Sequence, residues 1–314
     1  MLINLVPEFL AALSASDPLQ AYHRYLDDHR SILSAYCHNY VLDLDSPHAE
    51  SVILRTLAAP RRDLHQLLER VDVPTLAEEA LARCHELLEI DRPVQLYLMV
   101  GVGAANAGEL VVNGQGAAFV CLEHFTGRSS PDTYGMGLAP ELMGLWIAHE
   151  VAHLVRYTSP ASRSEFPRIL QESNGFYDYW ESGSRATLRE LLVNEGLAVA
   201  AAQAVAPGGE PWTYLGYSRR QYRRMRELDA FLRRSVDLEL HRTGLGFRLR
   251  YLSGGMSASA RLLNGKVIPE RSGYYLGWRM VEAMVNEIAI ATALRASPLE
   301  CFQAEERATG AQTA

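Results

Sequence analysis

The sequence is poor in cysteine and nearly free of lysine. Its 314 residues include only four cysteines, Cys37, Cys84, Cys121 and Cys301. They are far apart and form no C-x-x-C pair, which predicts reduced thiols in a cytoplasmic protein rather than a disulfide framework. Lys266 is the only lysine among 30 basic residues, and the formal net charge is −7. A general nucleic-acid-binding protein needs a basic surface, so we expect no nucleic-acid partner.

Long apolar runs are also absent. No apolar run approaches the roughly 18 residues of a transmembrane helix, and the acidic balance disfavours binding to anionic membranes. The apolar residues 1–13 are interrupted by Pro7 and Glu8, and no basic residue precedes Arg24, so no secretory signal is predicted. The overall composition, 48% hydrophobic and 21% charged residues, is that of an ordinary globular protein.

Apolar periodicity divides the chain into three regions. Residues 1–92 form a helical region with expected helices over 17–36, 61–71 and 75–90, the last starting with a capping box at Thr75 and Glu78. Residues 93–158 contain short strands over 94–102, 109–112 and 117–122, followed by a helix over 140–157. Asn113-Gly114 predicts a hairpin turn between the second and third strands. Residues 159–314 are again helical, with helices over 184–206, 218–241 and 273–296. The fold class is therefore α+β, mostly helical, with a small mixed sheet.

The segment His149-Glu150-Val151-Ala152-His153 is an H-E-x-x-H motif. Residues four apart lie on one face of a helix, so His149 and His153 can bind one metal ion through their imidazole nitrogens. Glu150 lies about 100° around the helix, where it can act as a general base on metal-bound water. The alternative is that the two histidines are ordinary residues of a helix face.

Glu195, in Asn194-Glu195-Gly196, is the candidate third ligand. Apolar residues flank it at helical spacing, and a carboxylate on such a face must be paired, neutralised or bound to a metal. A buried ion pair with an arginine is the alternative. Two histidines and one carboxylate on this helix motif favour one Zn²⁺ ion with an open position over iron.

These residues resemble the gluzincin metallopeptidases and, more narrowly, a bacterial family of predicted zinc-dependent proteases. The segment Gly273-Tyr274-Tyr275-Leu276-Gly277-Trp278-Arg279 is also similar to that family, and the resemblance extends over roughly 94–295. Glu195 lies 42 positions after His153, and no aspartate follows it at the usual short distance. The residues that orient the ligands in thermolysin-type enzymes are therefore not carried over.

The resemblance implies a zincin-like core and peptide-bond hydrolysis. It further implies a tyrosine or histidine that stabilises the oxyanion, for which Tyr275 is the first candidate, followed by Tyr274 and His241. Arg279 and Tyr274 are candidate substrate-binding residues, although Arg279 can equally pair with an internal acid. By the same resemblance, residues 117–121 are a candidate edge strand for extended substrate, with a plain core strand as the alternative.

The sequence thus predicts a zinc-dependent peptidase in which Glu150 is the general base and a peptide or protein is the substrate. One alternative is a zinc-dependent amidase that acts on a small non-peptide substrate, which a pocket closed to chain passage would favour. Another is a non-catalytic metal-binding module on the same fold. The arginine-rich helix over 218–241 is interpreted as a solvated face rather than an anion site.

Overall fold

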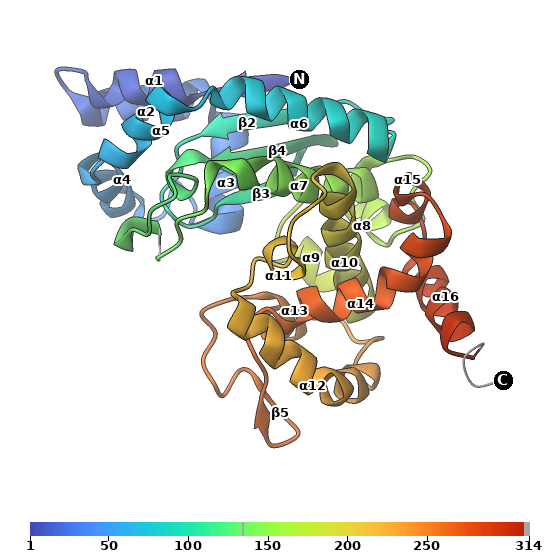
Figure 1. Ribbon diagram of the computed structural model, residues 1–314. Coiled ribbons are helices and arrows are strands. Elements are labelled where there is room, and N and C mark those ends of the chain that lie inside the picture. The colour runs from blue at the N-terminus through green and yellow to red at the C-terminus, as the bar shows by residue number, and fades with distance from the viewer. Residues whose placement is uncertain (134, 311–314) are drawn as a thin grey trace.

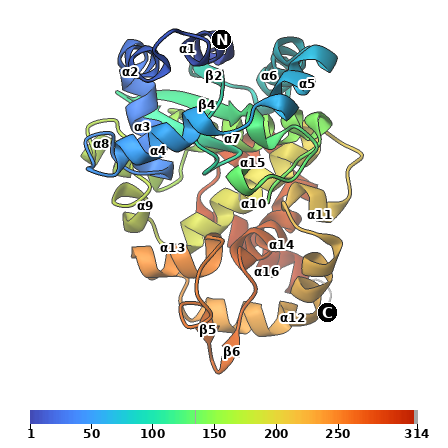
Figure 2. The ribbon, with the colours of Figure 1, turned by 90° about the vertical axis from the view of Figure 1, so that its left-hand side faces the viewer.

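The computed structural model describes residues 1–133 and 135–310. The chain has the predicted α+β architecture, mainly helical with a small mixed sheet. The N-terminal helices and the main sheet occupy the upper half of the molecule in both views, and most C-terminal helices lie below them (Figures 1 and 2). Among the described residues, no helix combines the length and the apolar character that a membrane crossing requires.

Four strands form the main sheet in the order β1-β2-β4-β3, and they are β1 (Leu2–Asn4), β2 (Val94–Met99), β3 (Ala107–Val112) and β4 (Gln115–Cys121). β1 and β4 pair with β2 in parallel, whereas β3 pairs with β4 antiparallel. Asn113 and Gly114 both have positive φ, 53° and 75°, and form the predicted tight turn between β3 and β4. The sheet is therefore mixed, and β1 was not foreseen because three residues carry no alternating pattern.

The prediction that residues 117–121 form an edge strand is wrong. These residues belong to β4, which lies inside the sheet between β2 and β3. All of them are buried, as expected for a strand covered on both faces. The edge next to β4 is β3.

Six helices precede the sheet region: α1 (Val6–Leu13), α2 (Pro18–Asp28), α3 (Arg30–Tyr40), α4 (Ala49–Ala58), α5 (Arg62–Arg70) and α6 (Val73–Leu88). The predicted helix over 17–36 is two helices, because His29 leaves the helical conformation at φ −113° and its ring contacts Glu8 at 2.7 Å. The predicted capping box at Thr75 is also wrong. Asp72 caps α6, accepting the Thr75 N–H at 3.2 Å, and the helix starts at Val73.

The long central helix is α7 (Met143–Thr158), which follows three short 3-10 turns, η1 (Leu122–His124), η2 (Pro131–Thr133) and η3 (Pro140–Leu142). All of its residues from Leu145 to Tyr157 are buried. It packs against β3 and β4 on one side and against α6 and α10 (Leu188–Val205) on others. A helix enclosed in this way is apolar around most of its circumference, so its few polar side chains need partners inside the protein.

The remaining elements are α8 (Phe166–Glu172), α9 (Ser182–Arg185), α11 (Pro211–Tyr214), α12 (Arg219–Asp237), α13 (Leu245–Leu252), β5 (Leu262–Leu263), β6 (Lys266–Val267), α14 (Ser272–Glu287), α15 (Ile290–Leu294) and α16 (Pro298–Gly310). Thr187, not Ser184, caps α10 by accepting the Glu190 N–H at 3.2 Å. The predicted last helix is interrupted after α14, because Ile288 is extended at φ −131°. Ser218 caps α12 in a capping box with Gln221.

Candidate metal centre

His149 and His153 lie on the same face of α7, as the motif spacing predicted. Their ring centroids are 4.8 Å apart, and each side chain is almost completely buried. Each ring directs its Nε2 atom toward Glu195, which lies on the facing helix α10. The two histidines and the glutamate therefore converge from two adjacent helices.

The three side chains form a compact donor set. Glu195 Oε2 lies 3.3 Å from His149 Nε2 and 3.7 Å from His153 Nε2, and one ligand atom from each residue lies within 4.8 Å of the others. Two ligands that bind zinc at about 2.0–2.1 Å with a tetrahedral angle are about 3.3 Å apart. Glu195 Oε2 is buried and makes no hydrogen bond among the described residues. This orphaned oxygen and the spacing fit a zinc ion held between the three residues.

Burial keeps the two histidines neutral. It lowers the pKa of His149 to about 3, with a further lowering by the charge of Arg271. It also lowers the pKa of His153, against the opposing influence of Glu195. Neutral imidazole is the form that binds a metal ion, so the environment favours ligation without loss of a proton from the rings.

Aromatic rings hold the two imidazoles in orientation. The His149 ring lies 5.5 Å from the Trp146 ring and stacks on the Tyr274 ring at 6.0 Å with an interplanar angle of 13°. The His153 ring stacks on the Tyr157 ring at 6.0 Å. No hydrogen-bond partner for His149 Nδ1 exists among the described residues. Ring packing thus performs the orienting role that a carboxylate often has in zinc sites.

Glu150, the predicted general base, stays outside the donor set and lies beside Glu109 of β3. Burial raises the pKa of Glu150 well above its usual value, and the charge of Glu109, the charge of Glu195 and a hydrogen bond with Glu109 raise it further. Burial would also raise the pKa of Glu109, but the charge of Arg248 and hydrogen bonds, including one from Tyr40, oppose it, and the pKa is lowered. Burial and the neighbouring charge of Glu109 therefore favour the protonated form of Glu150.

Two tyrosines fix the Glu109 carboxylate. The Tyr40 hydroxyl donates to Oε2 at 3.0 Å, and the Tyr157 hydroxyl donates to Oε1 at 3.1 Å. Sequence reasoning missed Glu109, because a single acid in a short apolar strand has no local pattern. Whether the Glu109 side chain points toward α7 depends on the register of the sheet, which the sequence alone does not fix.

Tyr274, rather than Tyr275, lies beside the metal ligands. Tyr275 points to the other side of α14, where its ring is 6.2 Å from Tyr222 and 6.3 Å from Trp278. Its hydroxyl is hydrogen-bonded to Asp229 of α12, a contact that raises its pKa to about 12 together with burial, the larger cause. This geometry places the Tyr275 ring among residues of α12 and α14, away from the three converging side chains.

Two other predicted residues lie away from the cluster. Arg279 pairs with Glu282 one turn further along α14 and is about one-third exposed. Of its two predicted partners, a substrate carboxylate and an acid of the protein itself, Arg279 therefore pairs with the second. His241 lies exposed after α12. Neither side chain contacts the three converging residues.

Arg271 is a second residue that the sequence analysis missed. Its guanidinium carbon lies 4.3 Å from the centroid of the Tyr274 ring, the same ring that stacks on His149. Arg271 immediately precedes α14 and has a left-handed backbone, φ 57°. Its position just before the motif Gly273–Arg279 was the available signal, but its direction depends on the turn that leads into the helix.

The glycines of the two motifs meet where α10 crosses α14. A Cβ atom on Gly196 would overlap the carbonyl of Gly277, and one on Gly277 would overlap the carbonyl of Leu192. The Asn194-Glu195-Gly196 and Gly273–Arg279 segments are thus one packing unit. This close crossing sets Glu195 on one helix next to Tyr274 on the other.

The outer edge of β3 is occupied by the protein's own groups. The Tyr40 hydroxyl accepts the Glu109 N–H at 3.2 Å and lies 3.1 Å from the Glu109 carbonyl oxygen. The Tyr177 N–H donates to the Val111 carbonyl at 2.9 Å. An extended peptide that adds to a sheet edge needs these backbone groups free. An added peptide strand therefore cannot pair with β3 at Glu109 or at Val111.

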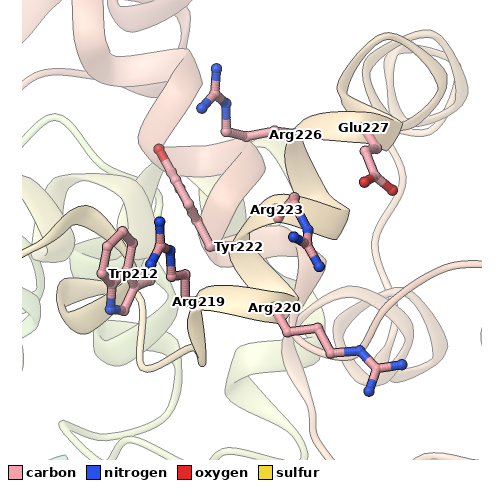
Figure 3. Close-up of a pocket in the computed structure, with 7 residues that line it drawn as sticks. All are labelled: Trp212, Arg219, Arg220, Tyr222, Arg223, Arg226 and Glu227. Atoms are coloured by element: carbon pink, nitrogen blue, oxygen red, sulfur yellow. The ribbon is translucent and has the colours of Figure 1, made fainter.

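A separate groove with a volume of about 980 Å³ lies along α11 and α12 (Figure 3). Its lining residues are Trp212, Arg219, Arg220, Tyr222, Arg223, Arg226 and Glu227. The arginines are exposed, as the interpretation of a solvated face predicted, and Arg219 lies over the Trp212 ring at 5.8 Å. None of the metal-binding candidates lines this groove.

A family model described as Predicted Zn-dependent protease (DUF2268) matches residues 176–301. This match confirms the predicted family resemblance over that segment, which contains Glu195, Arg271 and Tyr274 but begins after the H-E-x-x-H helix. No curated protein and no solved structure matches the chain. The family description is that of a zinc-dependent protease by prediction, and the buried triad on α7 and α10 agrees with it.

Proposed function

We propose that the protein is a zinc-dependent peptidase with one metal ion bound by His149, His153 and Glu195. The observation that carries the proposal is the convergence of two neutral imidazoles and an orphaned carboxylate oxygen within 3.3 and 3.7 Å. Three protein ligands leave a tetrahedral ion one open position, which is typical of catalytic rather than structural zinc.

Each neighbouring side chain has a role in this proposal. When bound, zinc supplies Lewis-acid chemistry and lowers the pKa of a coordinated water to about 7. In its deprotonated form, Glu150 takes up a proton from the attacking water and passes it to the leaving amine. Glu109 keeps Glu150 basic through its negative charge. The Tyr274 hydroxyl, beside His149, donates a hydrogen bond to the developing oxyanion.

The test combines metal analysis with peptide hydrolysis. Purified protein should contain one zinc per chain, and Glu195→Ala should lose it while keeping the fold. Glu150→Gln should keep the zinc but lower kcat by about 10²- to 10⁴-fold, because the general base is removed. Equal turnover by wild type and Glu150→Gln, or full zinc occupancy in Glu195→Ala, would contradict the proposal.

A specific observation favours a second candidate, a zinc-dependent amidase for small substrates. The closed edge of β3 removes the backbone groups that would align a long chain. The Glu195 side chain is only 12% exposed, so access to the centre is narrow. A length series from an acylated amino-acid amide to a decapeptide separates the two, since the amidase loses activity as soon as the chain extends on both sides.

A further inference from the structure

We infer that Arg271 binds a carboxylate of the substrate, so that the preferred substrate is a short peptide with a negatively charged group near the cleaved bond. This inference rests on the proposed function and names the class of substrate for the same centre. Its ligand chemistry, a carboxylate, has two sources in a peptide, the free C-terminus and an acidic side chain.

Arg271 is placed against the metal-binding residues. Its guanidinium lies over the Tyr274 ring at 4.3 Å, and that ring stacks on His149. A Cβ atom on Gly216 would lie 3.1 Å from Arg271 Nη1 and 3.2 Å from the Trp146 ring, and Trp146 also contacts His149. The guanidinium therefore lies near His149, bordered by Trp146 and Tyr274.

The charge of Arg271 has no dedicated counter-ion. Among the described residues, no carboxylate lies within ion-pair distance of it, and the adjacent Glu270 pairs with Arg261 at 3.5 Å. Glu195 influences Arg271 electrostatically but belongs to the donor set. By contrast, the buried Arg156 is paired with Glu190. A largely buried cation that has an aromatic ring but no carboxylate beside it is only partly compensated, and a substrate carboxylate would offset the remaining cost.

The exposure of the side chains shows from which direction a substrate reaches the centre. His149, Glu150 and His153 are buried, whereas Glu195, Arg271 and Tyr274 are each partly exposed. Solvent therefore meets the centre on the side of Arg271 and Tyr274. A substrate that enters there passes the Arg271 guanidinium.

The experiment measures binding, so that it does not depend on turnover. Zinc-loaded Glu150→Gln protein is titrated calorimetrically with three probes: Ala-Ala-Ala, its C-terminal amide, and Ala-Glu-Ala amide. We expect at least one carboxylate probe to bind about 10- to 100-fold more tightly than Ala-Ala-Ala amide, since hydrogen bonds to charged groups are worth that much. The tighter of the two carboxylate probes identifies the source of the carboxylate.

Variants of Arg271 complete the test in the same background. Arg271→Gln should remove the preference for the carboxylate, and Arg271→Lys should keep part of it, because the charge remains without the planar fork. Arg220→Gln, which changes an exposed arginine of α12, is the matched control and should keep the full preference. Thermal melting and zinc content show that each variant is folded and loaded.

Several results would overturn the inference. The first is that the Kd values of the carboxylate probes and of Ala-Ala-Ala amide agree within twofold. The second is that no probe binds. The third is that Arg271→Gln still binds a carboxylate probe more tightly than the amide. Failure of the proposed function is distinct from these: wild-type enzyme would then cleave no peptide, whether or not the acids bind more tightly than the amide.

Discussion

Glu109 and Glu150 are buried and Glu195 is 12% exposed, and each of these three neighbouring acids is stabilised differently. Glu195 faces the imidazole nitrogens, and Glu109 is held by the hydroxyls of Tyr40 and Tyr157. For Glu150, burial and the charge of Glu109 raise the pKa and favour the protonated form. A raised pKa also means that the deprotonated carboxylate is a stronger base toward water.

Glu109→Gln tests this electrostatic arrangement. The negative charge of Glu109 raises the pKa of Glu150, so its removal should lower that pKa. The acid limb of the kcat/KM profile should then shift to lower pH, while zinc content stays unchanged. The measurement is a pH series from 4 to 9 with peptide substrate. An acid limb that does not move, in a folded and zinc-loaded variant, would show that Glu109 has no influence on the base.

Tyr274→Phe and Tyr275→Phe distinguish the two neighbouring tyrosines. Tyr274 is beside His149, so loss of its hydroxyl should lower kcat by about 100-fold with little change in KM, as for other oxyanion donors. Tyr275 packs against Tyr222, so Tyr275→Phe should cost only about 1 kcal/mol of stability. The reverse order of effects in steady-state kinetics would restore the assignment of Tyr275.

The sequence predicts the residues whose geometry is local. His149, Glu150 and His153 lie within one helical turn, so their relative directions follow from helix periodicity. Glu195 was identifiable because a carboxylate in an apolar stripe needs a partner. Tyr274 was ranked behind Tyr275, and Arg271 was missed, since their directions depend on the rotation of α14 about its axis and on the turn before it.

At the scale of elements, the glycines of the two motifs are needed where α10 crosses α14. Gly196 and Gly277 bring the two helix backbones into direct contact. Larger residues would separate the helices and move Glu195 away from Tyr274 and the histidines. The glycines are thus required for close packing rather than for an unusual backbone conformation.

Gly277→Ala should therefore destabilise the protein by about 3 kcal/mol, as expected for an overpacked site. The new methyl group overlaps the carbonyl of Leu192, which is backbone and has little freedom to move. Gly246→Ala, in α13, is the matched control. No atom lies within 4 Å of its added Cβ, so this change should be neutral or stabilising by up to about 1 kcal/mol. Urea unfolding of both variants gives the comparison, and equal stabilities would contradict the packing argument.

Most helices and the three longer strands were predictable, but their ends and neighbours were not. The N-cap residue sets where a helix begins. Asp72 caps α6 and Thr187 caps α10, instead of the nearby Thr75 and Ser184 that the sequence predicted. The position of β4 inside the sheet results from its parallel pairing with β2 on one side and its antiparallel pairing with β3 on the other. Such long-range pairing leaves no local signature in the sequence.

At the scale of the whole molecule, buried histidines link stability to pH. His124 is fully buried, and burial lowers its pKa to about 4 from the ordinary 6.5. The unfolded chain therefore takes up a proton near pH 6.5 that the folded protein does not accept until about pH 4. The contribution of neutral His124 to stability is complete above pH 6.5 and is lost as the pH falls to about 4.

His124→Phe should weaken this pH dependence. Over the interval from pH 6.5 to 4, wild type should lose up to about 3 kcal/mol more stability than the variant. The free energy of unfolding is measured in urea at half-unit pH steps, with chelator present so that metal release does not contribute. Parallel curves for the two proteins would show that His124 is protonated equally in the folded and unfolded states.

The proposed metal ligands also connect the two halves of the structure. His149 and His153 lie on α7, which packs on the sheet, whereas Glu195 lies on α10, which packs on α14. An ion bound by all three binds the folded state only, so it should stabilise the protein by about 4 kcal/mol at a thousandfold excess over its Kd. Chelation should therefore lower Tm, and added Zn²⁺ should restore it. Glu195→Gln should have the Tm of the chelated wild-type protein with or without Zn²⁺, because the ligand that joins α10 to α7 is lost. If this variant responded to zinc as wild type does, the ion would have to be held by α7 alone, and the proposed link between the two halves would not exist.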